Sequence, residues 1–275
     1  MVKAISRNIN SNVMFNKNSW YHQVPKKRVI KILLRAFYGN YIDKWLHHGQ
    51  YAKLTKFKRI HEGERLFVIA TGPSLTIEDV NLLKDEYTFS MNSCYKLFDK
   101  TSWRPSYYAI FDQRVFQMLR EDLFKQTFEC AFCPSLNFDW DASFVNKIPM
   151  CWDWKYLFKE YASFIEHGFS NEISKKVYTG TNVVHVIFQI AAYMGFSEIY
   201  ILGADCTMGT HSKVVEYNQN EDATKAVIPN EHIIQDYRML KEETDKLGIK
   251  VYNATRGGAL EVFPRVCLEN VLNRS

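Results

Sequence analysis

From Arg65 onward, short apolar segments alternate along the chain with segments that have helical character. The strand-like segments are Leu66–Ala70, Tyr87–Met91, Tyr107–Phe111, Cys130–Cys133, Ile148–Trp152, Glu198–Gly203 and Ile249–Tyr252. Helix-like segments lie between them at Thr76–Leu83, 181–195 and Glu231–Leu247. Strands that alternate with helices in this way pair in parallel, and helices cover both faces of their sheet. The sequence therefore predicts an α/β, Rossmann-like fold with a mainly parallel sheet, whose ligand lies at the carboxyl ends of the strands.

Charge is distributed unevenly along the chain. Residues 1–60 contain 13 Lys and Arg against one acidic residue, Asp43, and so carry a net charge of +12. Residues 61–275 contain 22 basic and 29 acidic residues, a net charge of −7, so the modest total of +5 hides two opposed parts. We therefore predict a basic helical leader over residues 1–60 and a Rossmann-like domain over residues 61–275.

The leader contains an apolar row at helical spacing, formed by Ile30, Leu34, Phe37, Tyr41 and Trp45. A second row at intervals of four is basic and contains Lys27, Lys31 and Arg35. This pattern predicts an amphipathic basic helix that can lie on an anionic membrane surface through residues 26–59. The alternative is a helix that packs on the rest of the chain with its cations in water. Nucleic acid is not an expected partner, because nothing beyond charge resembles a recognition module.

The sequence predicts a cytoplasmic location. Its start lacks the apolar region of a secretory signal, and the longest weakly polar run, 182–196, is too short to span a bilayer. The leader could hold such a protein on the inner face of the cell membrane. Six cysteines suit a reducing compartment. Cys130 and Cys133 have the spacing of a redox or zinc pair, but without a second pair they are predicted to be buried strand thiols.

Small and hydroxyl-bearing residues follow the first predicted strand at Thr71, Gly72, Pro73 and Ser74. Gly72 allows the backbone to approach a ligand closely, while Ser74 can donate its hydroxyl and cap the next helix, whose N-terminus favours phosphate. The segment lacks the three-glycine dinucleotide fingerprint and the Walker lysine, which disfavours ordinary NAD and P-loop ATP sites. A purely structural turn is the alternative.

Two further segments should converge with this turn if the sheet is parallel. Asn92 and Ser93 follow the second strand, where the amide of Asn92 can bind a sugar hydroxyl or a base. An Asx-turn is the alternative for Asn92. Thr179, Gly180 and Thr181 precede the predicted buried helix, and such a helix start suits an anion. Simple N-capping by one of the two threonines is the alternative.

In this order, the segments resemble the bacterial sialyltransferases of glycosyltransferase family 42. They also resemble the related domains of motility-associated flagellin glycosyltransferases and of archaeal MptE-like (6-hydroxymethylpterin pyrophosphokinase-like) proteins, over about residues 65–270. In the sialyltransferases an Asn-Gly-Pro-Ser turn holds the cytidine nucleotide, and the turn at Thr71 is similar, with Thr in place of Asn. Their Asn-Gln, Thr-Ser-Gly and Gly-Ile-Asp segments are similar to Asn92-Ser93, Thr179-Gly180-Thr181 and Gly203-Ala204-Asp205. The resemblance implies a variant of the GT-A fold in which these residues bind the donor.

The same resemblance implies a general base. In the sialyltransferases it is a His just before a helix that leads into an Ile-Lys-Leu-Tyr strand, and here His232 precedes Ile249-Lys-Val-Tyr252 in that way. His232 would take the proton of the acceptor hydroxyl, for which a pKa near neutrality is suited. His211, on the long polar loop from Thr207 to Pro229, is the competing candidate.

The binding of the leaving phosphate departs from the sialyltransferase pattern. Thr207 stands where the first of two phosphate-binding tyrosines is expected, and Tyr217 is a loose candidate for the second. The segment Asn253-Ala-Thr-Arg-Gly-Gly258 resembles the flagellin-transferase and pterin-kinase branches instead. Arg256 could bind a donor phosphate or carboxylate through two hydrogen bonds, and a surface arginine in a glycine turn is the alternative.

Together, these features predict an inverting, metal-independent glycosyltransferase. It would move a nonulosonic (sialic-type) sugar from a CMP donor to a saccharide or lipid-linked acceptor in the synthesis of surface polysaccharides or glycoconjugates. We expect no cofactor besides the CMP-sugar donor and no metal ligands, because Asp139-Trp-Asp141 lies in an aromatic, loop-like context away from the strand ends. A homo-oligomer is compatible with the sequence.

Two rival functions remain open at this point. The first is a diphosphokinase that moves pyrophosphate from ATP to a hydroxymethyl pterin, for which Asp112 and Asp205 would hold Mg²⁺ at the strand ends. The second is a non-catalytic module that binds a nucleotide or serves as a membrane scaffold.

Overall fold

The computed structural model describes residues 30, 34, 37–135, 138–150, 168–206 and 230–273. The chain divides into two units, and the larger one spans residues 47–150 and 167–275. It therefore begins at His47, before residue 61 of the predicted boundary. Residues 47–60 are packed against the sheet, since Tyr51 and Phe57 are buried and the rings of Phe57 and Phe132 are in contact.

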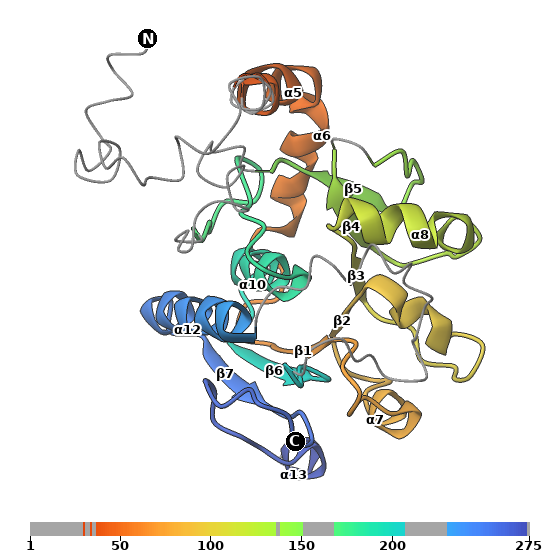
Figure 1. Cartoon of the computed structure of the whole chain (residues 1–275), viewed down its shortest axis with the longest axis vertical. Coiled ribbons are helices and arrows are strands. Elements are labelled where there is room, and N and C mark those ends of the chain that lie inside the picture. The colour runs from red at the N-terminus through yellow and green to blue at the C-terminus, as the bar shows by residue number, and fades with distance from the viewer. Residues whose placement is uncertain are drawn as a thin grey trace. The chain divides into compact units, whose positions relative to one another are not determined.

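Seven parallel strands form one sheet in the order β5-β4-β3-β2-β1-β6-β7 (Figure 1). They are β1 (Arg65–Ile69), β2 (Thr88–Met91), β3 (Tyr107–Ala109), β4 (Ala131–Pro134), β5 (Val145–Ile148), β6 (Glu198–Leu202) and β7 (Lys250–Asn253). This sheet confirms the predicted Rossmann-like α/β fold. The strand predicted at Ile148–Trp152 lies earlier in the sequence than expected. It is β5, which ends at Ile148, and Met150 pairs only with Val177 in an isolated bridge.

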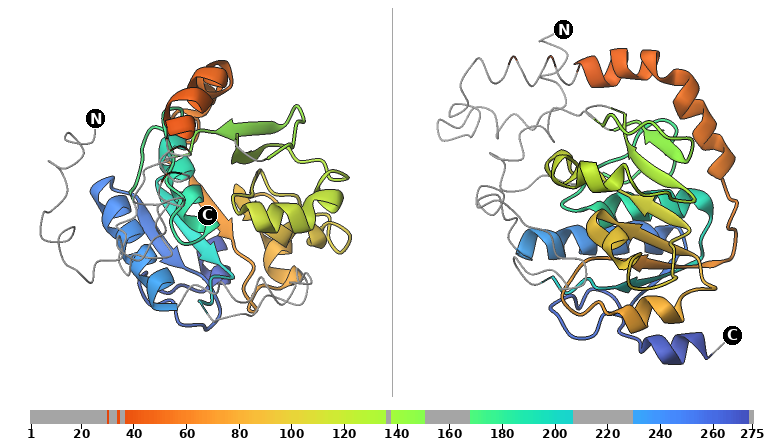
Figure 2. Two further views of the ribbon diagram at one scale, coloured as in Figure 1. Left: turned by 45° about the horizontal axis from the view of Figure 1, so that its top comes forward. Right: turned by 90° about the vertical axis from the view of Figure 1, so that its right-hand side faces the viewer.

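Helices cover both faces of the sheet. They are α6 (His48–Ala52), α7 (Ile77–Leu82), α8 (Gln113–Leu123), α10 (Val183–Met194), α12 (Asn230–Lys246) and α13 (Leu268–Leu272), with 3-10 turns η2 (Lys53–Phe57) and η3 (Asn92–Leu97). The strands from β1 to β5 progress one way along the sheet, and those from β6 to β7 progress the other way. Right-handed crossovers then place α7 and α8 on one face and α10 and α12 on the other (Figure 2).

The two faces have different cores. Phe67 and Ile69 of β1 belong to an aromatic core beneath α7 and α8 that includes Tyr108 and Phe116. On the opposite face α10 is buried along its length, with 11 of its 12 residues buried. A mainly apolar sequence, interrupted by His185 and Gln189, suits a helix surrounded in this way, and the helix ends at Gly195, which has a positive φ of 91°.

Strand β1 is an inner strand of the sheet. It pairs with β2 on one side and with β6 on the other, and its last residue, Ile69, lies level with Leu202 of β6. The direction of strand order reverses between β1 and β6, which makes this the topological switch point of the sheet. Ligands of open α/β sheets bind at the carboxyl ends of the strands at such a point. The predicted turns after β1 and β6 therefore lie side by side where a ligand is expected.

The smaller unit is described at residues 30, 34 and 37–46. It contains α5 (Asp43–Leu46), which follows directly on a π-helical turn η1 (Tyr38–Ile42). The helix predicted from the apolar row is thus present at these residues. Across all described ranges, no helix is both long enough and apolar enough to cross a membrane.

Candidate functional site

The turns after β1 and β6 are joined through a buried carboxylate. The N–H of Gly72 donates to the carbonyl oxygen of Gly203 at 2.7 Å. The Ser74 hydroxyl donates to Asp205 Oδ2 at 2.9 Å, and the N–H of Ser74 reaches the same oxygen at 3.3 Å. Asp205 is only 5% exposed. Asp205, which we predicted to bind the donor, therefore holds the Gly-Pro-Ser turn in place.

Gly72 is needed for this close approach. A Cβ at residue 72 would lie 2.1 Å from Asp205 Oδ2 and 2.3 Å from the Gly203 carbonyl oxygen, so no other side chain fits there. Thr71 beside it is buried and Pro73 is exposed at the tip of the turn. The close contact with the turn after β6 thus explains why residue 72 is a glycine. The predicted contact of Gly72 with a ligand stays a prediction.

Asn92 and Ser93 lie at the same edge, after β2. Ile69 of β1 pairs with Ser90, so Asn92 stands level with the start of the Gly-Pro-Ser turn. Its φ of 49° is left-handed, a conformation that Asn tolerates better than most residues. The Asn92 Oδ1 and Ser93 Oγ atoms are buried and have no hydrogen-bond partner among the described residues. The alternative of an Asx-turn is therefore not formed, and both atoms could bind a ligand.

Thr181 is bound to α12. Its N–H and its hydroxyl both donate to Asp236 Oδ2, each at 2.7 Å. The N-cap of α10 is Asn182, so capping by Thr179 or Thr181, the alternative interpretation, is wrong. Asn182 makes no side-chain capping bond, and its Oδ1 atom is buried without a partner in the described parts of the chain. Since α10 runs antiparallel to the strands, its start lies at the carboxyl edge of the sheet.

A buried contact between His185 and Asp236, which the sequence analysis missed, fixes this arrangement. His185 Nδ1 lies 2.8 Å from Asp236 Oδ1, and His185 Nε2 lies 2.9 Å from the carbonyl oxygen of Gly168. Both ring nitrogens of His185 therefore lie within hydrogen-bonding distance of an oxygen that can accept. His185 is fully buried and Asp236 is 2% exposed. Gly180, with a φ of 56°, leaves room for this ring, because a Cβ there would collide with it.

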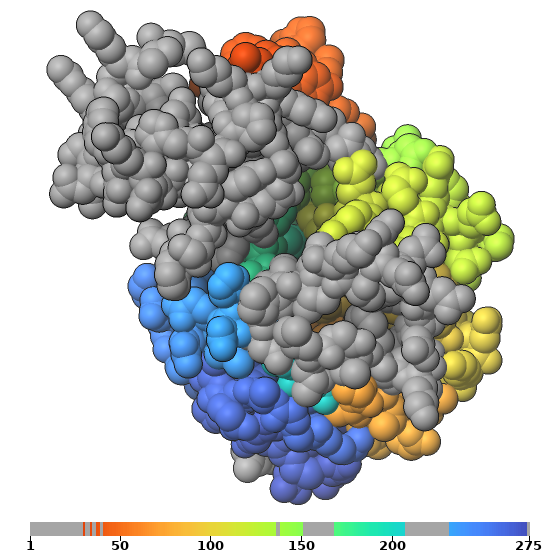
Figure 3. Space-filling view, viewed as in Figure 1, coloured from red at the N-terminus to blue at the C-terminus, as the bar shows by residue number. Residues whose placement is uncertain are grey.

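The start of α12 brings His232 to the same edge of the sheet. His232 is exposed in the first turn of α12, one turn before Asp236, on the helix that forms part of the surface in Figure 3. The competing base His211 and the tyrosine candidate Tyr217 lie outside the described residues, so the choice between the two histidines stays a prediction.

Tyr237 is a further residue that the sequence analysis missed. It is buried, and its hydroxyl interacts with the side chain of Asn182. Burial raises the pKa of Tyr237 well above its usual value of 10, and the nearby Cys206 and Asp236 add to this effect. Burial also raises the pKa of Cys206 to about 11. A phenol that stays neutral can donate a hydrogen bond. No local pattern in the sequence distinguishes Tyr237 from the other apolar positions of the helix.

Arg256 follows β7 and is engaged with two carboxylates. Its Nη2 atom lies 2.6 Å from Asp79 Oδ1, on α7, and 3.3 Å from Glu269 Oε1, on α13. The side chain is half exposed. A donor phosphate would have to compete with these carboxylates or displace them, and the predicted role of Arg256 in donor binding stays a prediction.

The carboxylates that would hold a metal in the diphosphokinase also have protein partners. Asp112 caps α8, since its Oδ1 accepts from the N–H groups of Arg114 and Val115 at 2.8 and 3.4 Å. Its Oδ2 pairs with the Arg114 guanidinium at 3.2 Å. Within the residues that the structure covers, no group of three or more His, Cys, Asp and Glu side chains is arranged to hold a metal ion.

Cys130 and Cys133 agree with the prediction of buried thiols. Cys133 is fully buried in β4, and Cys130, just before that strand, is half-buried. Burial raises the pKa of both thiols to about 12. They are therefore protonated at neutral pH, whereas a metal ligand or a reactive cysteine is a thiolate.

Comparison with known proteins yields one family match. A family model described as "6-hydroxymethylpterin diphosphokinase MptE-like" matches residues 40–210, which include β1 to β6 and the turns after them. This match confirms the predicted resemblance to the pterin-pyrophosphokinase-like proteins. It ends before His232 and Arg256, so the roles of these two residues have no support from it. No curated protein matches the sequence.

Among solved structures, the MAf glycosyltransferase from Magnetospirillum magneticum AMB-1 is similar, at 13% sequence identity and a TM-score of 0.44. The similarity covers 82% of this chain and 39% of that one. The chain thus spans about two fifths of the length of that structure.

Proposed function

Since the chain belongs to the MptE-like family, we propose that it is a transferase that binds a nucleotide-activated donor at the carboxyl edge of its sheet. The proposed reaction is inverting glycosyl transfer from a CMP-activated nonulosonic acid to a saccharide or lipid-linked acceptor. The observation that carries this proposal is the set of buried, unpartnered polar atoms on Asn92, Ser93 and Asn182. A buried polar atom without a partner destabilises a fold by about 1–3 kcal/mol, which a bound ligand would relieve.

The groups around these atoms suit the chemistry of a departing nucleotide. Amide and hydroxyl groups such as those of Asn92 and Ser93 bind a base or a ribose, which carry both donors and acceptors. The first N–H groups of α10 point out of the helix at the same edge, where no side chain caps them, and favour a phosphate. Tyr237, held neutral by burial, adds a donor beside Asn182. Fixed donors of this kind stabilise the negative charge that develops on the leaving CMP.

In the proposed reaction the bond between the anomeric carbon and the CMP phosphate breaks, and the acceptor oxygen attacks from the opposite face. The acceptor hydroxyl loses its proton to a base. His232 supports this role by its exposure in the first turn of α12, at the edge where the donor would lie. His211 is the second candidate for the base.

The name of the family favours a second candidate function, transfer of pyrophosphate from ATP to a hydroxymethyl pterin. Such a reaction uses a divalent cation to bridge the phosphates. Asp205 and Asp112 would have to supply oxygens to that cation while they anchor the turn after β1 and cap α8. Because these interactions compete with metal binding, we prefer the metal-independent glycosyl transfer.

A thermal-shift panel of CMP, CDP, UDP, GDP and ATP, each with Mg²⁺ and with EDTA, tests the proposal. A ligand at a hundred times its Kd stabilises the native state by about 2.7 kcal/mol, which raises the Tm by roughly 5–10 °C in a domain of this size. We expect CMP to produce this rise equally in Mg²⁺ and in EDTA. A rise with ATP and Mg²⁺ alone would favour the diphosphokinase, and no rise with any nucleotide would refute both reactions.

Replacement of His232 by Ala tests the assignment of the base. We expect kcat for transfer from a CMP-sugar to fall about 10²- to 10⁴-fold, the usual contribution of a general base, while the rise in Tm with CMP is kept. His48→Ala is the matched control, because His48 is also exposed at the start of a helix of the larger unit. If His232→Ala keeps full activity and His211→Ala loses it, the base is His211.

A further inference from the structure

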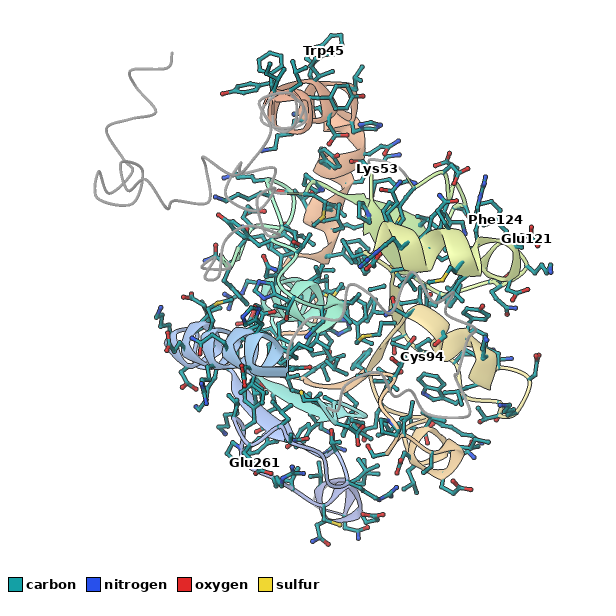
Figure 4. All side chains as sticks on the ribbon, viewed as in Figure 1. Trp45, Lys53, Cys94, Glu121, Phe124 and Glu261 are labelled. Atoms are coloured by element: carbon teal, nitrogen blue, oxygen red, sulfur yellow. The ribbon has the colours of Figure 1, made fainter. Side chains whose placement is uncertain are left out.

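The smaller unit exposes an apolar row along its helix. The side chains at helical spacing are Ile30 at 58% exposure, Leu34 at 64%, Phe37 at 51%, Tyr41 at 63% and Trp45 at 79%. Trp45 projects outward from the ribbon of α5 (Figure 4). Side chains of this size are normally covered, so the row is a surface that lacks its partner.

Exposed large apolar residues are more closely spaced in this row than elsewhere on the described surface. Of the 12 described residues from 30 to 46, eight are exposed large apolar residues, because Tyr38, Ile42 and Leu46 join the row. In the described parts of the larger unit, exposed large apolar residues are scattered singly, for example Leu82, Phe124 and Leu247. Single exposed residues are ordinary on a protein surface, whereas a continuous row marks an interaction site.

Charge identifies the kind of partner. The apolar row lies within residues 1–60, which carry a net charge of +12, and the basic residues Lys27, Lys31 and Arg35 stand close to its first members in the sequence. Contact between the apolar rows of two copies would bring two segments of charge +12 together, and these would repel each other. An anionic lipid surface satisfies both features, because it attracts the Lys and Arg side chains and accepts apolar residues between its headgroups.

The types of apolar residue agree with a lipid partner. Tyr38, Tyr41 and Trp45 contribute amphipathic rings, which are enriched where the hydrocarbon of a bilayer meets water. Phe37 and Tyr41 are in ring contact, with centroids 5.2 Å apart, and so present one aromatic surface. We propose that the described residues 30, 34 and 37–46 belong to a docking helix whose exposed apolar row lies in the surface of an anionic lipid bilayer. This proposal does not depend on the reaction that the larger unit catalyses.

Co-sedimentation of the full chain with vesicles tests the docking helix. We expect binding to vesicles of phosphatidylcholine with phosphatidylglycerol and much weaker binding to phosphatidylcholine alone. The triple variant Lys27→Gln, Lys31→Gln, Arg35→Gln should bind the anionic vesicles more weakly, by about fivefold for each charge removed. Equal binding of this variant and the wild type would overturn the electrostatic part of the proposal.

A second triple variant, Leu34→Gln, Tyr41→Gln, Trp45→Gln, removes the apolar row. It should bind anionic vesicles at least about tenfold more weakly, since each apolar side chain adds to partitioning into the headgroup region. Its matched control is Leu82→Gln, Phe124→Gln, Leu247→Gln, which removes three exposed apolar residues from the larger unit and should leave binding unchanged. Phe124 of this control is labelled in Figure 4.

Two results would overturn the proposal outright. The first is no binding of the wild-type chain to either kind of vesicle. The second is that the wild-type chain binds no vesicles and instead forms a concentration-dependent dimer in light scattering. The variant at Leu34, Tyr41 and Trp45 would then abolish this dimer. That outcome would make a second copy of the chain the partner of the apolar row.

Discussion

Replacement of Gly72 by Ala tests the contact that joins the turns after β1 and β6. The new Cβ would lie 2.1 Å from Asp205 Oδ2 and 2.3 Å from the Gly203 carbonyl oxygen, so one of them must move. The Asp205 carboxylate is held by the hydroxyl and the N–H of Ser74. The Gly203 oxygen belongs to the backbone and accepts the Gly72 N–H at 2.7 Å. Relief of the clash therefore breaks hydrogen bonds on at least one of the two turns.

The expected loss of stability follows from these bonds. A neutral backbone hydrogen bond contributes about 1 kcal/mol, and a bond to a charged group about 1.5–3 kcal/mol. We expect Gly72→Ala to lower the free energy of unfolding by about 3–4 kcal/mol, and the Tm by on the order of 10 °C. Urea unfolding followed by circular dichroism measures the first quantity, and calorimetry measures the second.

Gly49→Ala is the matched control for this substitution. Gly49 lies in α6 of the same unit, and a Cβ there would meet no atom within 4 Å. The control should stabilise the protein by about 0.5–1 kcal/mol, because Ala is less flexible than Gly in the unfolded chain. If Gly72→Ala unfolds at the same urea concentration as the wild type, the close contact between the two turns is refuted.

Three further predictions concern the surroundings of the site. Asp236→Ala removes the acceptor of the Thr181 N–H and hydroxyl and the partner of His185 Nδ1, so urea unfolding should show a loss of about 3–5 kcal/mol, and a loss under about 1 kcal/mol would contradict these buried contacts. Burial raises the pKa of the Cys133 thiol to about 12. The unfolded chain releases this proton at lower pH than the folded one, so the contribution of Cys133 to the free energy of unfolding should fall above about pH 9 by about 1.4 kcal/mol per pH unit, and Cys133→Ala should make the total decline shallower by that amount. Arg265 donates to three carbonyl oxygens of the loop that carries Arg256, so Arg265→Ala should lower the Tm more than Arg256→Ala. Arg256→Ala should instead raise KM for the donor at least about tenfold, and an unchanged KM would remove its predicted role.

The parallel sheet could be predicted because its strands are buried on both faces and so appear as continuous apolar runs. The displaced strand, β5, lies at the edge of the sheet, where Val145 and Asn146 are only partly buried and the sequence Val-Asn-Lys-Ile has a weaker apolar signal. Helix α8 was missed although its signals are present, since Phe116, Leu119 and Leu123 follow the cap Asp112 at helical spacing.

The candidate site could be predicted only as a set of segments. Gly72, Asn92 and Asp205 were found because each follows an apolar run, and topology then brings the ends of parallel strands to one edge. Their partners could not be predicted in the same way. Asp236 binds Thr181 from 55 positions away, and no local pattern connects these two residues. A contact of this kind depends on how α10 and α12 pack, which is a property of the folded chain.

The position of β6 beside β1 also has a consequence for the order in which the protein is made. Strands β1 to β5 are adjacent in both sequence and space, so this half of the sheet can pair while synthesis continues. Residues 203–205 hold the turn after β1 in place. At ordinary rates of translation they are synthesised about ten seconds later than that turn. Until then the Gly-Pro-Ser turn has no anchor. The proposed nucleotide site is therefore completed late in biosynthesis, after most of the core has been made.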